Sequence, residues 1–71
     1  MEVKRNKVTA EFYKDPFLTN LVGAVDVPAK RMMEAAQAIG KTICKVLHAD
    51  TLETSFINAD GERIDRILIH R

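Results

Sequence analysis

The chain has 71 residues, a formal net charge of +1 and a hydrophobic fraction of 46%. This length is enough for one domain, residues 1–71, and the hydrophobic fraction argues against a compositionally disordered chain. The near-neutral charge argues against a general polyanion-binding protein, which is usually much more basic.

A first strand is predicted over residues 3–13. Val8, Ala10 and Phe12 alternate with the more polar Lys7, Thr9 and Glu11. This two-residue period is typical of a strand with one buried face.

A short helix is predicted over residues 16–22. Asp15 suits a helix cap, Pro16 suits a first helical position, and Gly23 suits the turn after a helix end. This helix would present an apolar side made by Phe17, Leu18, Leu21 and Val22.

The main amphipathic helix is predicted at about residues 27–47. On a helical wheel, lysines and other polar residues occupy one arc and apolar residues the other. The apolar arc contains Met32, Ala35, Ala36, Ile39, Ile43, Val46 and Leu47. A second interpretation ends the helix near Gly40 and adds a strand at 41–48, because residues 42–46 are rich in strand formers. The long helix is favoured because its apolar arc stays in register across Gly40.

A hairpin is predicted at the end of the chain. Residues 51–59 and 63–70 flank Asp60-Gly61-Glu62, and Asp-Gly between two strand-like segments is a strong hairpin signal. The predicted fold is therefore α+β: a small single domain whose antiparallel sheet, made of the N-terminal strand and this hairpin, packs against the main helix.

The last strand is apolar on both faces. Ile64 and Leu68 share one face, while Ile67 and Ile69 share the other. A sheet of this kind needs a cover on both faces, and the main helix covers only one. Two covers remain open for the second face: the segment 16–25, or another protein chain.

Motifs for catalysis, metal or cofactors are weak. Gly40-Lys41-Thr42 resembles the end of a phosphate-binding loop, but the required earlier glycine is replaced by Ala35 and no strand precedes the motif. Cys44 and His48 are four residues apart, as two metal ligands on a helix would be, yet a structural zinc site needs four ligands. We therefore predict no enzyme activity, no catalytic residues, no metal site and no cofactor.

The predicted function is a small non-enzymatic protein-interaction module, self-associating as a dimer or bound to a larger protein as its adaptor, inhibitor or regulator. The interface is predicted on the sheet face opposite the helix and centred on the last strand, because interface cores favour apolar residues and are depleted in lysine. Its predicted residues are Phe56, Ile57, Arg66, Ile67, Ile69 and Arg71.

The alternative function is nucleic-acid binding through two basic groups. Lys4, Arg5 and Lys7 form one group, and Lys30, Lys41 and Lys45 form the other on the polar side of the main helix. A cytoplasmic location is expected, because the chain has a single cysteine and its N-terminal residues lack the apolar stretch of a signal peptide. No membrane association is expected, because no apolar run is long enough to span a bilayer.

Overall fold

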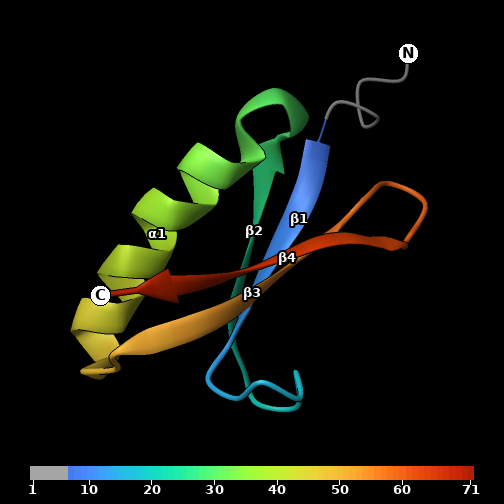
Figure 1. Cartoon of the computed structure of the whole chain (residues 1–71). Coiled ribbons are helices and arrows are strands. Elements are labelled where there is room, and N and C mark those ends of the chain that lie inside the picture. Colours follow the sequence, from blue (N-terminus) through green and yellow to red (C-terminus); the bar gives the residue numbers. More distant parts are fainter. Residues whose placement is uncertain (1–6) are drawn as a thin grey trace.

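Four antiparallel strands and one helix make up the computed structural model, which describes residues 7–71 (Figure 1). The elements in chain order are β1 (Lys7–Tyr13), β2 (Leu21–Pro28), the 3-10 helix η2 (Ala29–Arg31), α1 (Met32–Leu47), β3 (Thr51–Ile57) and β4 (Arg63–His70). The strand order is β2-β1-β3-β4, so β1 and β3 are central while β2 and β4 form the edges. This confirms the predicted α+β architecture, with the described part of the first strand and the hairpin at their expected places.

The predicted helix at 16–22 is wrong, because this segment divides between a turn and a strand. The Asp15 carboxylate accepts hydrogen bonds from the N–H of Asn20 at 2.7 Å and from the N–H and hydroxyl of Thr19 at 3.1 and 2.7 Å. Asp15 therefore stabilises a turn, a common role for aspartate. From Leu21 onward the chain is β2, which pairs antiparallel with β1 and is rich in β-branched valine.

The main helix begins later than predicted and runs through Gly40. Pro28 ends β2, and α1 begins at Met32 after the short η2 turn. Because Gly40 lies inside α1, the alternative strand at 41–48 is wrong. The helix ends at His48, whose left-handed backbone (φ 56°) directs its N–H to the carbonyl oxygens of Cys44 and Lys45. This is the usual backbone geometry at a helix C-terminus.

The β3–β4 hairpin closes as predicted around Asp60-Gly61. Gly61 has a φ of 83°, a left-handed conformation that glycine adopts without strain. The side-chain oxygen of Asn58 accepts hydrogen bonds at 2.9 Å from the N–H groups of Asp60 and Glu62. A register shift at Phe56/Ile57 accompanies the turn.

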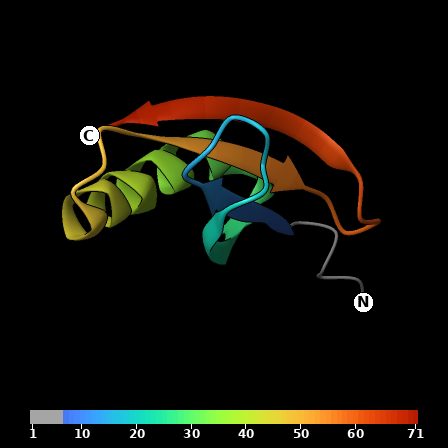
Figure 2. The same cartoon turned by 90° about the horizontal axis from the view of Figure 1, so that it is seen from below.

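The helix covers one face of the sheet, and we call the other face the open face (Figure 2). Gly40 of α1 lies against Phe12 and Ile69, which places both of these side chains on the helix face. Strand alternation and the register then assign the remaining residues. The helix face carries Val8, Ala10, Phe12, Val27, Leu52, Thr54, Phe56, Ile67 and Ile69. The open face carries Thr9, Glu11, Tyr13, Glu53, Ser55, Ile57, Arg66 and Leu68.

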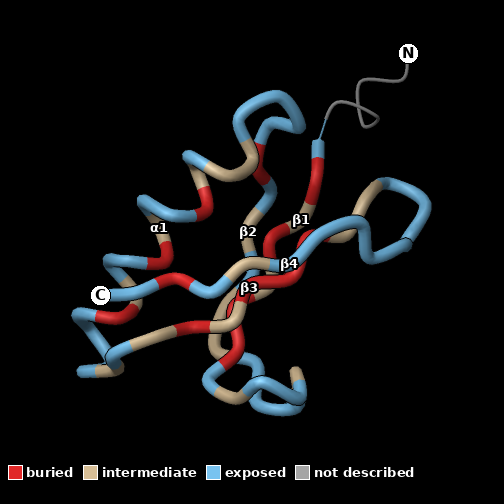
Figure 3. Tube along the Cα trace, in the orientation of Figure 1, coloured by how far each residue is buried: buried red, intermediate tan, exposed pale blue. Residues whose placement is uncertain are grey.

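Burial is concentrated in the central strands and the inner side of α1 (Figure 3). Phe12, Phe56, Leu52, Ala36 and Cys44 are fully buried in one core. β4 is mostly exposed, and Ile69 is its one buried residue. Within residues 7–71, no helix has both the length and the apolar composition needed to cross a membrane.

Candidate interaction surface

The predicted interface residues divide between the core and the surface. Phe56 is fully buried and Ile69 is 2% exposed, both under α1. The expectation that Ile69 lies on the face opposite the helix is therefore wrong. Ile67 also points to the helix face, where it is half-buried at the margin of the core. Ile57 is half-buried on the open face, and Arg66 and Arg71 are exposed.

Two apolar side chains of β4 that were not among the predicted interface residues lie exposed on the side opposite the helix. Leu68 is 47% exposed and Ile64 is 46% exposed. Both alternate with Ile67 and Ile69, as the sequence pattern indicates. The pattern does not say which of the two sets the helix covers. That choice depends on the contact between Ile69 and Gly40.

A hydrogen-bonded group of polar side chains occupies the middle of the open face. The Tyr13 hydroxyl donates to Oε1 of Glu11 at 2.6 Å, and Arg63 donates to the same oxygen at 3.3 Å and to Oγ of Ser55 at 2.7 Å. The hydrogen bond to Glu11, together with burial, raises the pKa of Tyr13. These contacts link β1, β3 and β4 and leave the centre of the open face polar.

Arg66 joins the open face to the turn between β1 and β2. Its Nε donates to Oε1 of Glu53 at 2.9 Å, and its guanidinium also donates to the carbonyl oxygen of Pro16. The turn accordingly curves toward β4 (Figure 2). Leu18 of this turn lines a shallow depression with Ser55 and Ile64. Residues 16–18 thus cover part of the open face, whereas Leu68 remains exposed beside them.

The outer edge of β4 has backbone groups that no strand of the described chain pairs with. The N–H of Arg71 donates to the carbonyl oxygen of Asp50 at 2.9 Å, so Arg71 directs its backbone toward β3. Backbone direction alternates along an antiparallel strand. Hence the backbone N–H and C=O groups of Ile67 and Ile69 also point to β3. Those of Arg66, Leu68 and His70 point outward, away from β3.

Charged side chains bind two of these outward groups. Oδ1 of Asp65 accepts a hydrogen bond from the backbone N–H of Arg66 at 2.8 Å. Nζ of Lys41 donates to the carbonyl oxygen of His70 at 3.1 Å. The outward N–H and C=O of Leu68 lie between these two capped groups.

The edge formed by β2 is less suited to strand pairing. Its register with β1 shifts at Phe12/Tyr13, and it ends at Pro28, which has no N–H to donate. The register shift does not distinguish the two edges, because β3 and β4 also shift at Phe56/Ile57. A proline at an edge strand discourages pairing with another chain, and β4 contains no proline. β4 is therefore the better candidate for an edge that takes a second strand.

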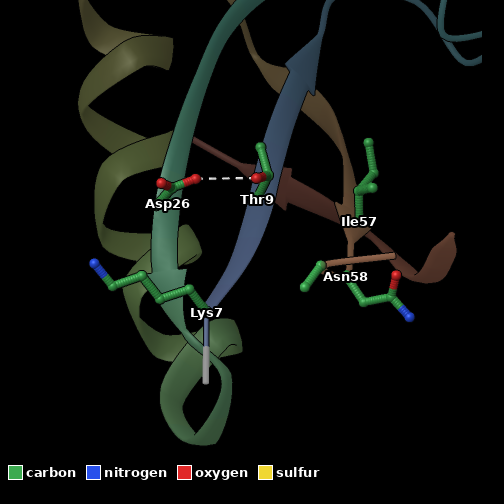
Figure 4. A pocket seen from close by; sticks show the side chains of 6 residues that line it. Lys7, Thr9, Asp26, Ile57 and Asn58 are labelled. Atoms are coloured by element: carbon green, nitrogen blue, oxygen red, sulfur yellow. Dashed lines mark hydrogen bonds between the residues drawn. The ribbon is translucent and has the colours of Figure 1, made fainter. Parts of the chain in front are cut away.

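The basic residues of the alternative function do not form one group in the described chain. Lys4 and Arg5 lie outside the described residues. Lys7 is exposed at the start of β1, where it lines a shallow pocket with Asp26 (Figure 4). Lys30 is exposed in η2, whereas Lys41 and Lys45 lie in the second half of α1. At a rise of about 1.5 Å per residue, Lys41 lies roughly 14 Å along α1 from its first residue, Met32, and Lys30 precedes Met32.

The remaining motifs of the sequence have structural roles. Lys41 and Thr42 lie within α1, so their backbone N–H groups face along a helix and not into a phosphate-binding loop. Cys44 is fully buried in the core, and His48 forms the helix end. Within residues 7–71, His, Cys, Asp and Glu side chains form no group of three or more that could hold a metal ion.

Comparison with known proteins gives no match to a protein family, to a curated protein or to a solved structure.

Proposed function

We propose that this protein is a small non-enzymatic protein-interaction module that self-associates through β4. The observation that carries the proposal is the exposure of Leu68 beside the unpaired outer edge of the same strand. An edge strand with free N–H and C=O groups is a template for a second chain, and an apolar side chain beside it gains from burial.

The composition of the surface around β4 supports this proposal. Interface cores favour apolar residues and arginine and are depleted in lysine and glutamate. β4 contributes Ile64, Ile67 and Leu68 together with Arg66, and it contains no lysine or glutamate. The free thiol of Cys44 is consistent with a reducing, cytoplasmic location.

Sedimentation or light scattering at micromolar concentrations tests the proposal. The expected mass is about twice the 8.0 kDa of one chain, falling toward 8.0 kDa on dilution. Leu68→Glu should reduce association strongly, because it places a carboxylate in an apolar contact. Val46→Glu is the matched control, because Val46 is an exposed apolar residue (71%) that belongs to α1 and not to the β4 edge. A wild-type chain that stays monomeric at every concentration would contradict self-association.

The alternative, nucleic-acid binding, has less support because the described lysines are dispersed and Lys41 already contacts His70. Oligonucleotide binding at two salt concentrations distinguishes the two functions. Phosphate contacts weaken as salt rises. Tight, salt-sensitive binding by a chain whose Leu68→Glu variant behaves like wild type would favour the alternative.

A further inference from the structure

We infer that two copies of this chain pair antiparallel through their β4 edges, with Leu68 of one copy directly opposite Leu68 of the other. This inference rests on the proposed self-association and specifies its geometry. It follows from the direction of the edge backbone groups, from the side chains that each register would bring together, and from the charged groups that cap the free edge.

The backbone allows only some registers. Arg66, Leu68 and His70 direct their N–H and C=O groups outward, so these residues form the hydrogen-bonded pairs with a second strand. In a symmetric dimer each residue faces a residue of the second copy that is equally far from the symmetry axis. Residues directly opposite each other in an antiparallel pair have their side chains on the same face of the sheet. A residue at the axis therefore faces its own copy, and the helices of both copies lie on the same side of the combined sheet.

Side-chain chemistry separates the possible registers. An axis at Arg66 would place the two Arg66 side chains opposite each other, and an axis at Asp65 would do the same with two carboxylates. Like charges directly opposite each other are destabilising. An axis at Ile67 would place Asp65 opposite Ile69, a charge against an apolar residue.

An axis at Leu68 avoids these conflicts at the centre and at the ends of the paired segment. On the open face, Leu68 faces its own copy. On the helix face, Ile67 faces Ile69 of the second copy, and Asp65 faces Arg71 of the second copy. These are apolar pairs at the centre and an opposite-charge pair at each end, the combination that stabilises antiparallel strands.

The two charged caps of the free edge fit the same register. With the axis at Leu68, Arg66 lies opposite His70 of the second copy. The N–H of Arg66, which Asp65 now holds, would donate to the carbonyl oxygen of His70, which Lys41 now holds. Pairing therefore releases the carboxylate of Asp65 and the ammonium group of Lys41 of the second copy, and these two groups lie close to each other. The released Lys41 lies next to Asp65 of the second copy, so the caps of the free chain become contacts of opposite charge between the copies.

Disulfide trapping of single-cysteine additions tests the register. In a hydrogen-bonded antiparallel pair the two α-carbons are about 5.5 Å apart, within reach of a disulfide. Leu68→Cys should therefore give a covalent dimer under mild oxidation. Ile64→Cys is the matched control, because Ile64 is equally exposed and its two copies would be roughly 27 Å apart, eight residues at about 3.4 Å each. The native Cys44 is kept because its thiol is buried, and the wild-type chain measures how much covalent dimer Cys44 forms by itself.

The outcomes separate this inference from the proposed function. A covalent dimer from Leu68→Cys but not from Ile64→Cys supports the register. A wild-type dimer that is trapped by Arg66→Cys or Ile64→Cys, and not by Leu68→Cys, overturns the register and leaves self-association standing. A dimer trapped at none of these positions overturns the register at Leu68 and leaves self-association standing. A wild-type monomer at all concentrations overturns both.

Charge exchange gives an independent test of the same register. Asp65→Arg alone and Arg71→Asp alone should each weaken dimerisation by about tenfold, because each change acts twice in a symmetric dimer. The double variant should recover most of the wild-type affinity. Arg71 also contacts Asp50 in its own chain, so recovery in the double variant is the decisive measurement. Additive losses in the double variant would contradict the opposition of Asp65 and Arg71.

Discussion

Gly40 and Ile69 are in such close contact that there is no room for a side chain at residue 40. A β-carbon built on Gly40 would lie 2.5 Å from Cδ1 of Ile69 and 3.3 Å from Cε1 of Phe12. The helix therefore lies directly on the sheet where β4 joins the core. This contact, between residues far apart in the chain, determines which face of β4 remains exposed.

Gly40→Ala should destabilise the protein although alanine is the better helix former. The gain in helix propensity is about 1 kcal/mol, whereas extra atoms in a packed core cost about 1–3 kcal/mol. Ile69 is 2% exposed, and both its Cδ1 and its Cγ2 lie close to the added β-carbon, so the side chain must shift within the core. We expect a net loss of about 1 kcal/mol in the free energy of unfolding, measured by urea denaturation. A more stable variant would contradict the close contact.

Ile69→Val tests the same contact from the other side, because it removes Cδ1. Alone, Ile69→Val should lower the free energy of unfolding by about 0.5–1.5 kcal/mol. Combined with Gly40→Ala, it should cost less than the sum of the two single changes, since the clash is relieved. Strict additivity in a double-mutant cycle would show that the two residues do not interact.

Thr54 and Ser55 should respond in opposite ways when their hydroxyl groups are removed. Thr54 is fully buried on the helix face, and its Oγ1 has no hydrogen-bond partner. Thr54→Val keeps the shape and should raise the free energy of unfolding by about 1 kcal/mol. Ser55 is equally buried but accepts a hydrogen bond from Arg63 at 2.7 Å. Ser55→Ala should lower the free energy of unfolding by about 1–2 kcal/mol. Equal decreases in the free energy of unfolding for both variants would contradict the absence of a hydrogen bond at Thr54.

Tyr13 is the only tyrosine in a chain without tryptophan, so its ultraviolet absorbance reports on one group. Its hydrogen bond to Glu11 and its burial raise its pKa. The folded chain thus holds the phenolic proton more tightly than the unfolded chain. The resulting stability is fully present below the pKa of an unfolded tyrosine and is lost as the pH rises through the folded value. Glu11→Gln should lower the pKa of Tyr13 in an absorbance titration.

Asp26→Asn is the control for this titration. Asp26 is a carboxylate on the same sheet, but it accepts a hydrogen bond from Thr9 at 3.0 Å and not from Tyr13 (Figure 4). Its substitution should leave the pKa of Tyr13 nearly unchanged. Equal shifts in both variants would indicate a general charge effect in place of the specific hydrogen bond.

His48→Gly should stabilise the protein by about 0.5–1 kcal/mol, because glycine adopts the left-handed backbone of this position without strain. His48 is exposed and has a φ of 56°. Lys45→Gly, an exposed change inside α1, should instead lower the stability by about 1 kcal/mol. Thermal melts of both variants check the contrast. A lower melting temperature for His48→Gly would show that the His48 side chain makes a stabilising contact.

Local patterns in the sequence predict most of the fold. The alternation in β1, the amphipathic arc of α1 and Asp60-Gly61 each act over a few residues, and each indicates the correct element. β2 was not predicted, because Asp15, Pro16 and Gly23 have the spacing of helix signals. The observed strand depends on pairing with β1, which a local pattern does not contain.

The exposed surface of β4 was only half predictable. The alternation of Ile67 and Leu68 shows that both faces of the strand are apolar, and the face assignment requires the contact between Ile69 and Gly40. The capping of Arg66 by Asp65 is local in sequence, whereas the capping of His70 by Lys41 joins the helix to the last strand. Only the tertiary structure brings these charged groups to one edge.

The central position of β1 affects how the chain folds during synthesis. Of the four strands, β1 leaves the ribosome first, and β2 can pair with it soon afterwards. The other neighbour of β1 is β3, where Thr9 pairs with Ile57. Until β3 emerges, the edge of β1 that pairs with β3 has no partner strand, even where α1 already covers Phe12, and such unpaired edges are prone to aggregate. A chain truncated before β3 would therefore keep β1, β2 and α1 but leave an edge of the central strand β1 unpaired, which favours aggregation.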